Sequence, residues 1–248
     1  MKFERPQKGN PHRLTVDQHV FPKRSLERYA GADGRIAVRR LAVSKDLRLR
    51  CDDPIFCARR AWDHGSEVGF MKACEDRFQA VARRICAGGD ALTSEESYAV
   101  SVFSALWRAR FSRRLGGQAD LELKGVLPGT QRTVDEEEQM ERAGMTFVRG
   151  LSIPARFQTG LAISYELSKM ARALRDVGWG VQRAERGELL LPDTFGERAA
   201  IPISPTICLY AGKEDTRLSL DDARALNRIA LETAIDYVAA RDFSSCPI

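Results

Sequence analysis

Apolar residues recur at intervals of three and four in several stretches of the chain, which is typical of amphipathic helices. A capping box of Thr93 and Glu96 opens one of them, and Ser219 with Asp222 opens the last. Glycine pairs follow two of the stretches, at Gly88 and Gly116, and mark their ends. The pattern predicts four main helices, over residues 66–87, 94–116, 160–177 and 219–241.

Shorter apolar runs, separated by turn residues, predict strands. Residues 34–41 follow an Asp33-Gly34 turn and form a half-buried strand of a hairpin, and three more runs lie between residues 180 and 210. Residues 116–150 are rich in glycine and then acidic, so we expect an insertion or a mobile crossing there. The sequence therefore predicts an α+β fold: one mainly helical domain over residues 1–248 with a small antiparallel sheet.

Composition fits a globular chain, with 44% hydrophobic and 29% charged residues. No apolar run reaches the length of a membrane span, and no hydrophobic segment follows the first charged residues. We therefore expect a cytoplasmic protein without a membrane partner. In that compartment the six cysteines are expected to be thiols, and their spacing matches no common zinc site.

The net charge of +5 is unevenly distributed. Residues 1–60 hold 15 basic and 7 acidic side chains, including the pairs Arg39-Arg40 and Arg59-Arg60. These arginines form either a solvated outer face or a surface for phosphate groups. A second basic cluster, Arg108 to Arg114, lies near the end of the helix 94–116, where the helix dipole already favours cations. The alternative interpretation is that this cluster binds an anion.

Three polar residues stand in apolar surroundings. At 100° per residue, Asn227 falls in the middle of the apolar face of the last helix, so its amide needs buried partners. Asp193 directly follows a buried strand, and His19 lies in an apolar extended run before Pro22. Each side chain is either a structural clamp or part of a site.

The stretch from Gln18 to Ala30, followed by Asp33-Gly34-Arg35-Ile36, resembles the opening of a bacterial family, domain of unknown function 4238. Later features come in the same order as in that family: Glu75, Arg108 or Arg110, Asp193, Pro202-Ile203-Ser204-Pro205 and Asn227. Gln18 replaces the first histidine of its His-His-x-x-Pro motif, and Thr194 departs from its Ser-Asp-Asn-Pro turn. The family has no assigned activity, so the resemblance implies which residues to test.

The first functional hypothesis is a hydrolase that acts on a phosphodiester or nucleotide. His19 would be a general base or metal ligand, Asp193 its carboxylate partner and Asn227 an orienting amide. Arg108 or Arg110 would contact the phosphate. The cofactor stays open, with a divalent metal ion as one candidate.

The second hypothesis is a non-catalytic module that binds nucleic acid or protein, with residues 1–60 and the cluster Arg108 to Arg114 as its basic surface. Binding to an anionic ligand of this kind weakens steeply with salt, because phosphate contacts release counterions. The third is that the polar residues only tie loops to the core. The sequence indicates no oligomeric state.

Overall fold

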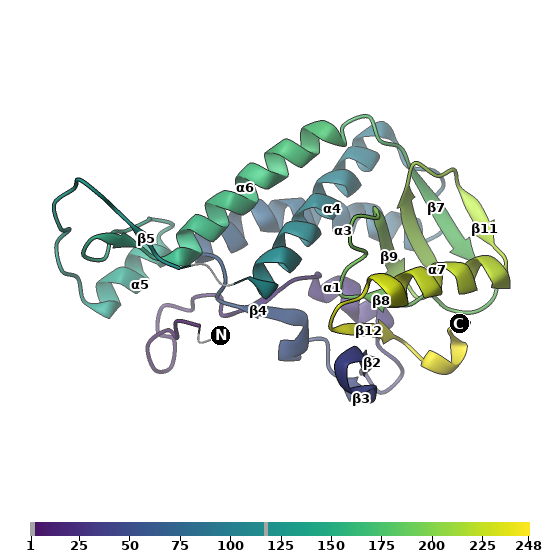
Figure 1. Cartoon of the computed structure of the whole chain (residues 1–248). Coiled ribbons are helices and arrows are strands. Elements are labelled where there is room, and N and C mark those ends of the chain that lie inside the picture. The colour runs from purple at the N-terminus through teal and green to yellow at the C-terminus, as the bar shows by residue number, and fades with distance from the viewer. Residues whose placement is uncertain (1–2, 117–118) are drawn as a thin grey trace.

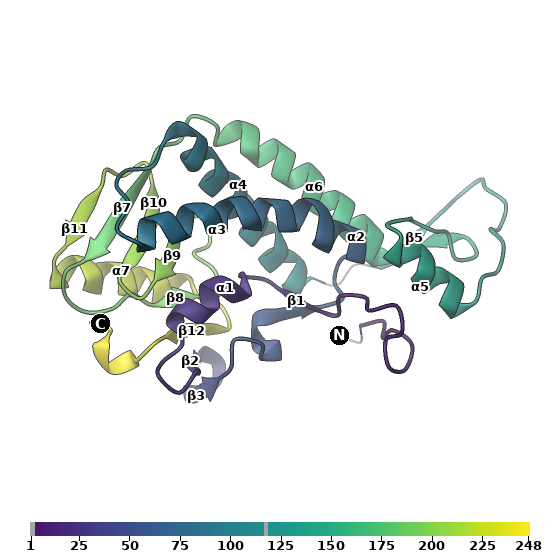
Figure 2. The same ribbon diagram turned by 180° about the vertical axis from the view of Figure 1, so that it is seen from behind.

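Three long helices form one side of the molecule, which a computed structural model describes over residues 3–116 and 119–248. They are α3 (Lys72–Cys86), α4 (Ser94–Leu115) and α6 (Ala155–Ala173), and α4 packs against both of the others (Figure 1, Figure 2). The predicted capping box of Thr93 and Glu96 is present at the start of α4. Phe78 of α3 stacks on Phe103 of α4 with ring centroids 3.7 Å apart, so apolar contact fixes this helix pair.

The other helices are short or lie apart from this group. They are α1 (Lys23–Leu26), α2 (His64–Ser66), α5 (Val134–Arg142) and α7 (Leu220–Thr233). Helix α2 continues through a π-helical turn, Glu67–Met71, into α3. Single 3-10 turns occur at Glu27–Tyr29, Leu41–Val43, Pro54–Phe56 and Phe243–Ser245.

Two four-stranded sheets lie at the end of the helices opposite α5 (Figure 1). The first has the order β11-β7-β10-β9, with β7 (Trp179–Ala184), β9 (Ala200–Ser204), β10 (Ile207–Ala211) and β11 (Thr216–Leu218). The second has the order β3-β2-β12-β8, with β2 (Ile36–Arg40), β3 (Lys45–Leu49), β8 (Leu191–Pro192) and β12 (Tyr237–Ala240). The strand pairs are antiparallel except β11 with β7. The hairpin predicted after Asp33-Gly34 is β2 with β3.

Two further pairs of strands lie outside these sheets. β1 (Asp17–His19) pairs with β4 (Cys57–Arg59), and β5 (Leu121–Glu122) pairs with β6 (Ser152–Ile153). The prediction of a mainly helical fold with one small antiparallel sheet is therefore wrong. The fold is mixed, with 42% helical and 19% strand residues in four small sheets. Strands of two or three residues are too short to show an alternating pattern in the sequence.

The last predicted helix accounts for part of this error. Helix α7 begins after Ser219, whose capping box with Asp222 is present, but it ends at Thr233 and not near Arg241. Ala234 is extended, and Tyr237–Ala240 forms β12 at the centre of its sheet. The small apolar residues 238–240 suit a helix or a strand, and pairing with β2 and β8 decides between them.

The segment predicted as an insertion or a mobile crossing, residues 116–150, carries β5 and α5 in its described part. It lies at the end of the molecule farthest from the four-stranded sheets (Figure 1). Its helix α5 holds the N-terminal residues, since the Gln7 N–H donates to Glu138 Oε1 at 2.8 Å. That this segment is an insertion, and that the chain is a single domain, stay predictions. Along residues 3–116 and 119–248, every helix is too short or too polar for a membrane span.

Candidate anion-binding cleft

A cleft of about 660 Å³ lies where β4, the end of α4 and the start of α6 meet the N-terminal residues. Its volume is typical of small-molecule sites, which span about 300–1,000 Å³. Two acidic residues, Glu4 and Asp120, line it together with a larger number of basic ones. We name it the arginine cleft, after Arg59, Arg60, Arg113, Arg114 and Arg156.

Three elements bring these arginines together. Arg59 ends β4, and Arg60 follows with a φ of 44°, in the left-handed region that residues other than glycine rarely adopt. Arg113 and Arg114 lie in the last turn of α4, where the helix dipole favours a cation. Arg156 lies in the first turn of α6, where the dipole disfavours one. Its position therefore depends on carboxylates nearby.

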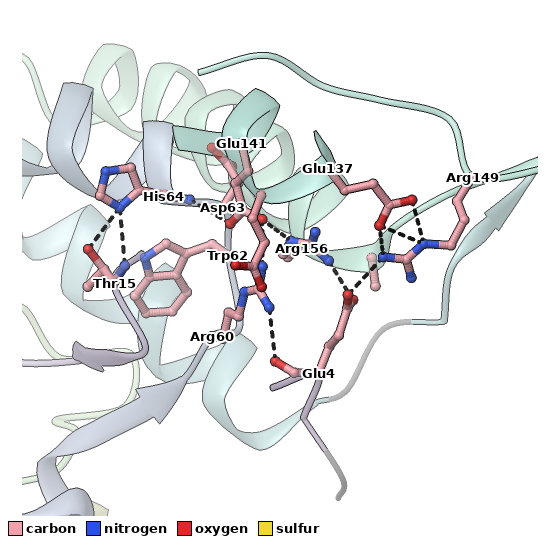
Figure 3. A network of polar contacts seen from close by, with 12 residues as sticks. Glu4, Thr15, Arg60, Trp62, Asp63, His64, Glu137, Glu141, Arg149 and Arg156 are labelled. Atoms are coloured by element: carbon pink, nitrogen blue, oxygen red, sulfur yellow. Dashed lines mark hydrogen bonds and ion pairs between the residues drawn. The ribbon is translucent and has the colours of Figure 1, made fainter. Parts of the chain in front are cut away.

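A network of ion pairs supplies those carboxylates (Figure 3). Glu141 of α5 is 1% exposed, and its Oε2 accepts from Arg60 at 2.8 Å and from Arg156 Nε at 2.8 Å. A second guanidinium nitrogen of Arg156, Nη1, donates to Glu4 at 2.6 Å. Arg149 also donates to Glu4, at 2.8 Å, and pairs with Glu137. Buried charges are tolerated when they are paired and hydrogen-bonded in this way.

The remaining cleft arginines are paired as well. Each donates to a carboxylate from a different part of the chain, so their positions are fixed before any ligand arrives. Such pairs are worth little where they are exposed and more where they are partly buried. The pairs are Arg59 with Asp17 at 3.3 Å, Arg113 with Glu166, and Arg114 with Asp236 at 2.9 Å.

Two cleft arginines nevertheless carry donors without an acceptor. The Nε atoms of Arg60 and Arg113 are buried and have no hydrogen-bond partner among the described residues. A buried donor left unpaired costs about 1–3 kcal/mol. Backbone strain at Arg60 adds to that cost, and strained residues cluster at functional sites.

The start of α6 also faces the cleft, through Ala155, Arg156 and Thr159. The Ala155 N–H donates to Oδ1 of Asp120 at 2.9 Å. A helix N-terminus attracts anions because its N–H groups and dipole are positive. Here a carboxylate of the protein uses one of those N–H groups.

His64 supports the network from the side of α2 (Figure 3). Its backbone N–H donates to Glu141 Oε1 at 3.3 Å, and its Nδ1 accepts from the Thr15 N–H at 3.2 Å. Burial lowers the pKa of His64, and Arg142 lowers it further. The imidazole is therefore neutral near pH 7 and adds no charge to the cleft.

Of the residues singled out in the sequence, His19 and Arg110 come together. Arg110 is fully buried and donates to the His19 carbonyl at 3.2 Å, to Glu67 at 3.0 Å and to Glu75. The His19 ring lies 3.0 Å from the Cys51 carbonyl oxygen through Nε2. Arg108 is partly exposed. Neither Arg108 nor Arg110 lines the arginine cleft, and their predicted phosphate contacts stay predictions.

Asp193 and Asn227 are both hydrogen-bonded to backbone. The Asp193 carboxylate accepts from the N–H groups of Ile235 and Asp236 at 3.0 and 2.8 Å, just beyond α7. Burial raises the pKa of Asp193, although these two bonds act in the opposite direction. Asn227 is 0% exposed, and its amide bonds to the backbone of residues 188, 190 and 247. Both side chains clamp loops in this structure.

The three residues proposed for catalysis thus have separate partners. Among the described residues, no hydrogen bond or ion pair joins His19, Asp193 and Asn227 to one another. The described part of the chain also contains no group of three or more His, Cys, Asp or Glu side chains arranged to hold a metal ion. The catalytic roles of the three residues stay predictions.

Sequence reasoning found part of the arginine cleft. The pair Arg59-Arg60 and the basic end of α4 were both candidates for an anion surface, and the structure places them on one cleft. Sequence reasoning missed Arg156 and Glu141, which belong to different helices. The helix predicted over residues 160–177 begins earlier in the structure, at Ala155, so Arg156 lay outside the helix that the sequence indicated.

No family model, curated protein or solved structure matches this chain. The resemblance to domain of unknown function 4238 stays a prediction.

Proposed function

We propose that the protein binds a phosphate-bearing ligand, a nucleotide or a nucleic-acid strand, in the arginine cleft. The observation that carries the proposal is the convergence of five arginines from β4, α4 and α6 on a cleft of about 660 Å³. Guanidinium groups bind phosphate with paired, directional hydrogen bonds.

The proposal favours the binding module over the hydrolase. The cleft supplies fixed donors for phosphate oxygens, whereas His19, Asp193 and Asn227 do not line it. Arg59 is the most exposed arginine of this site, since its side chain is 50% exposed and its pair with Asp17 lies at the surface. Its removal should weaken binding with little effect on the fold.

The test is equilibrium binding of fluorescein-labelled single-stranded DNA and RNA and of a labelled nucleotide, at about 50 and 200 mM salt. For a strand, affinity should fall steeply with salt. Arg59→Gln should weaken binding and lower the salt slope by about one for each lost phosphate contact. Strand binding without nucleotide binding identifies nucleic acid as the ligand, and binding of both identifies a nucleotide site.

Arg217→Gln is the matched control. Arg217 is 82% exposed, pairs with Glu185 at 3.7 Å and does not line the cleft. It removes the same charge from the protein, so it should leave affinity unchanged. Equal affinities for the wild type and Arg59→Gln, or binding that is insensitive to salt, would refute the proposal.

One observation favours the hydrolase as a second candidate. Glu67 and Glu75 line a separate cavity of about 470 Å³, and Arg110 holds one oxygen of each. Burial raises the pKa of Glu75, although Arg110 acts against it. A carboxyl group with a raised pKa can serve as a proton donor. If Glu75→Gln leaves the hydrolysis of a phosphodiester panel unchanged, this candidate is excluded.

A further inference from the structure

The N-terminal residues run along the arginine cleft without regular secondary structure. We name residues 3–6 the strap. Phe3 and Glu4 line the cleft. The Phe3 ring lies 4.7 Å from the Arg59 guanidinium carbon, and the Glu4 carbonyl accepts from Arg60 at 3.3 Å. The strap therefore touches the arginines that a phosphate would use.

The carboxylate of Glu4 resembles a bound anion in this position (Figure 3). One of its oxygens accepts from Arg149 at 2.8 Å and the other from Arg156 at 2.6 Å. Burial raises the pKa of Glu4, but Arg149, Arg156 and Arg60 outweigh it, so the net shift is downward. Glu4 is therefore ionised near pH 7, and two guanidinium groups donate hydrogen bonds to it as they would to a phosphate.

The strap can leave the cleft while the arginines that contact it keep other carboxylate partners. Arg149 keeps Glu137, and both Arg60 and Arg156 keep Glu141. The Glu4 side chain is 43% exposed, so water replaces its contacts when it moves. The next anchor along the chain is the Gln7 N–H, which donates to Glu138, so residues 3–6 can swing about Gln7.

We propose that Glu4 is a built-in competitor for the arginine cleft, and that a phosphate-bearing ligand binds by displacing the strap. The inference rests on the proposed function of the cleft, and it adds that the strap lowers the affinity for the ligand. A ligand that needs a minor, strap-free state binds more weakly by the fraction of protein in that state. Ligand and strap thus exclude each other through Arg156.

The test compares the wild type with Glu4→Gln and with Glu197→Gln, using the labelled oligonucleotide and inorganic pyrophosphate as its competitor. Glu197 is exposed and does not line the cleft, so Glu197→Gln loses the same charge without touching the strap. If the strap-free state makes up about a tenth of the protein or less, Glu4→Gln should bind about tenfold tighter or more. Glu197→Gln should bind like the wild type.

A second measurement follows the strap itself. A glutamate-specific protease cuts after Glu4 only when that side chain is released, so pyrophosphate should speed this cut in the wild type. Glu4→Gln lacks the cleavage site and is the control. Slower cleavage with pyrophosphate would overturn the inference.

The outcomes also separate this inference from the proposed function. If the wild type binds and Glu4→Gln binds within twofold of it, the strap is no competitor, and the cleft keeps its proposed function. If neither protein binds the labelled oligonucleotide or the labelled nucleotide, the proposed function fails and the inference fails with it.

Discussion

Asn227 offers a sharp test of whether a buried polar residue is a clamp or part of a site. Its Oδ1 accepts from the Leu190 N–H at 2.8 Å. Its Nδ2 donates to the carbonyl oxygens of Glu188 at 2.8 Å and Pro247 at 3.0 Å. One side chain of α7 therefore holds the segment that leads into β8 and the C-terminal residues.

Truncation by Asn227→Ala removes all three bonds. Leu190 is 1% exposed and Glu188 is 7% exposed, so their backbone groups gain no full replacement from water. Each buried group left unpaired costs about 1–3 kcal/mol. Pro247 is partly exposed and contributes less. We expect the free energy of unfolding to fall by about 2–4 kcal/mol.

The measurement is urea denaturation followed by tryptophan fluorescence, with Arg228→Ala as the control. Arg228 is the next residue of α7 and is exposed, so its change should stay within about 0.5 kcal/mol. Ligand binding by folded Asn227→Ala should equal that of the wild type. Unchanged stability together with lost binding would refute the assignment of Asn227 as a clamp and return it to the site.

Two further predictions concern buried carboxylates. Glu141→Gln removes the charged partner that the buried Arg60 and Arg156 share, so it should lower the free energy of unfolding by about 3–5 kcal/mol. The control Asp46→Asn, at an exposed ion pair, should lower it by less than about 1 kcal/mol. Similar losses for the two variants in urea denaturation would contradict this prediction. Burial raises the pKa of Asp193, so its contribution to stability is complete below the unfolded pKa and is lost as pH rises through the folded pKa. A titration followed by NMR of the carboxyl carbons should give Asp193 a pKa above 3.8 and Asp46 a pKa below 3.8, because Arg39 stabilises the Asp46 anion. The reverse order of the two pKa values would refute the argument.

Local signals in the sequence predicted the features that depend on neighbours along the chain. The capping boxes at Thr93 and Ser219 mark the true starts of α4 and α7. The position of Asn227 on the apolar face of α7 correctly predicted its burial. A capping box closes within one helical turn, and residue spacing alone determines which face of a helix carries Asn227.

Features that depend on distant pairing were not predictable in this way. Tyr237–Ala240 becomes a strand because β2 and β8 lie on either side of it, and nothing near residue 237 in the sequence encodes those partners. β1 with β4 is a similar case, since its three-residue strands are about forty residues apart. Tertiary contact overrides local preference in both places.

The uneven charge of the chain also takes on a different meaning in three dimensions. Residues 1–60 carry 15 basic and 7 acidic side chains, yet some of these arginines take their carboxylates from far along the chain. Arg60 pairs with Glu141, and Arg40 pairs with Asp236. Net charge counted along the sequence therefore overstates the positive potential that a ligand meets. A ligand in the arginine cleft gains instead from the half-exposed Arg59 side chain, and from the donors of Arg149 and Arg156 that Glu4 gives up. Affinity should thus respond more to the removal of Glu4 than to the loss of an equal charge elsewhere on the protein.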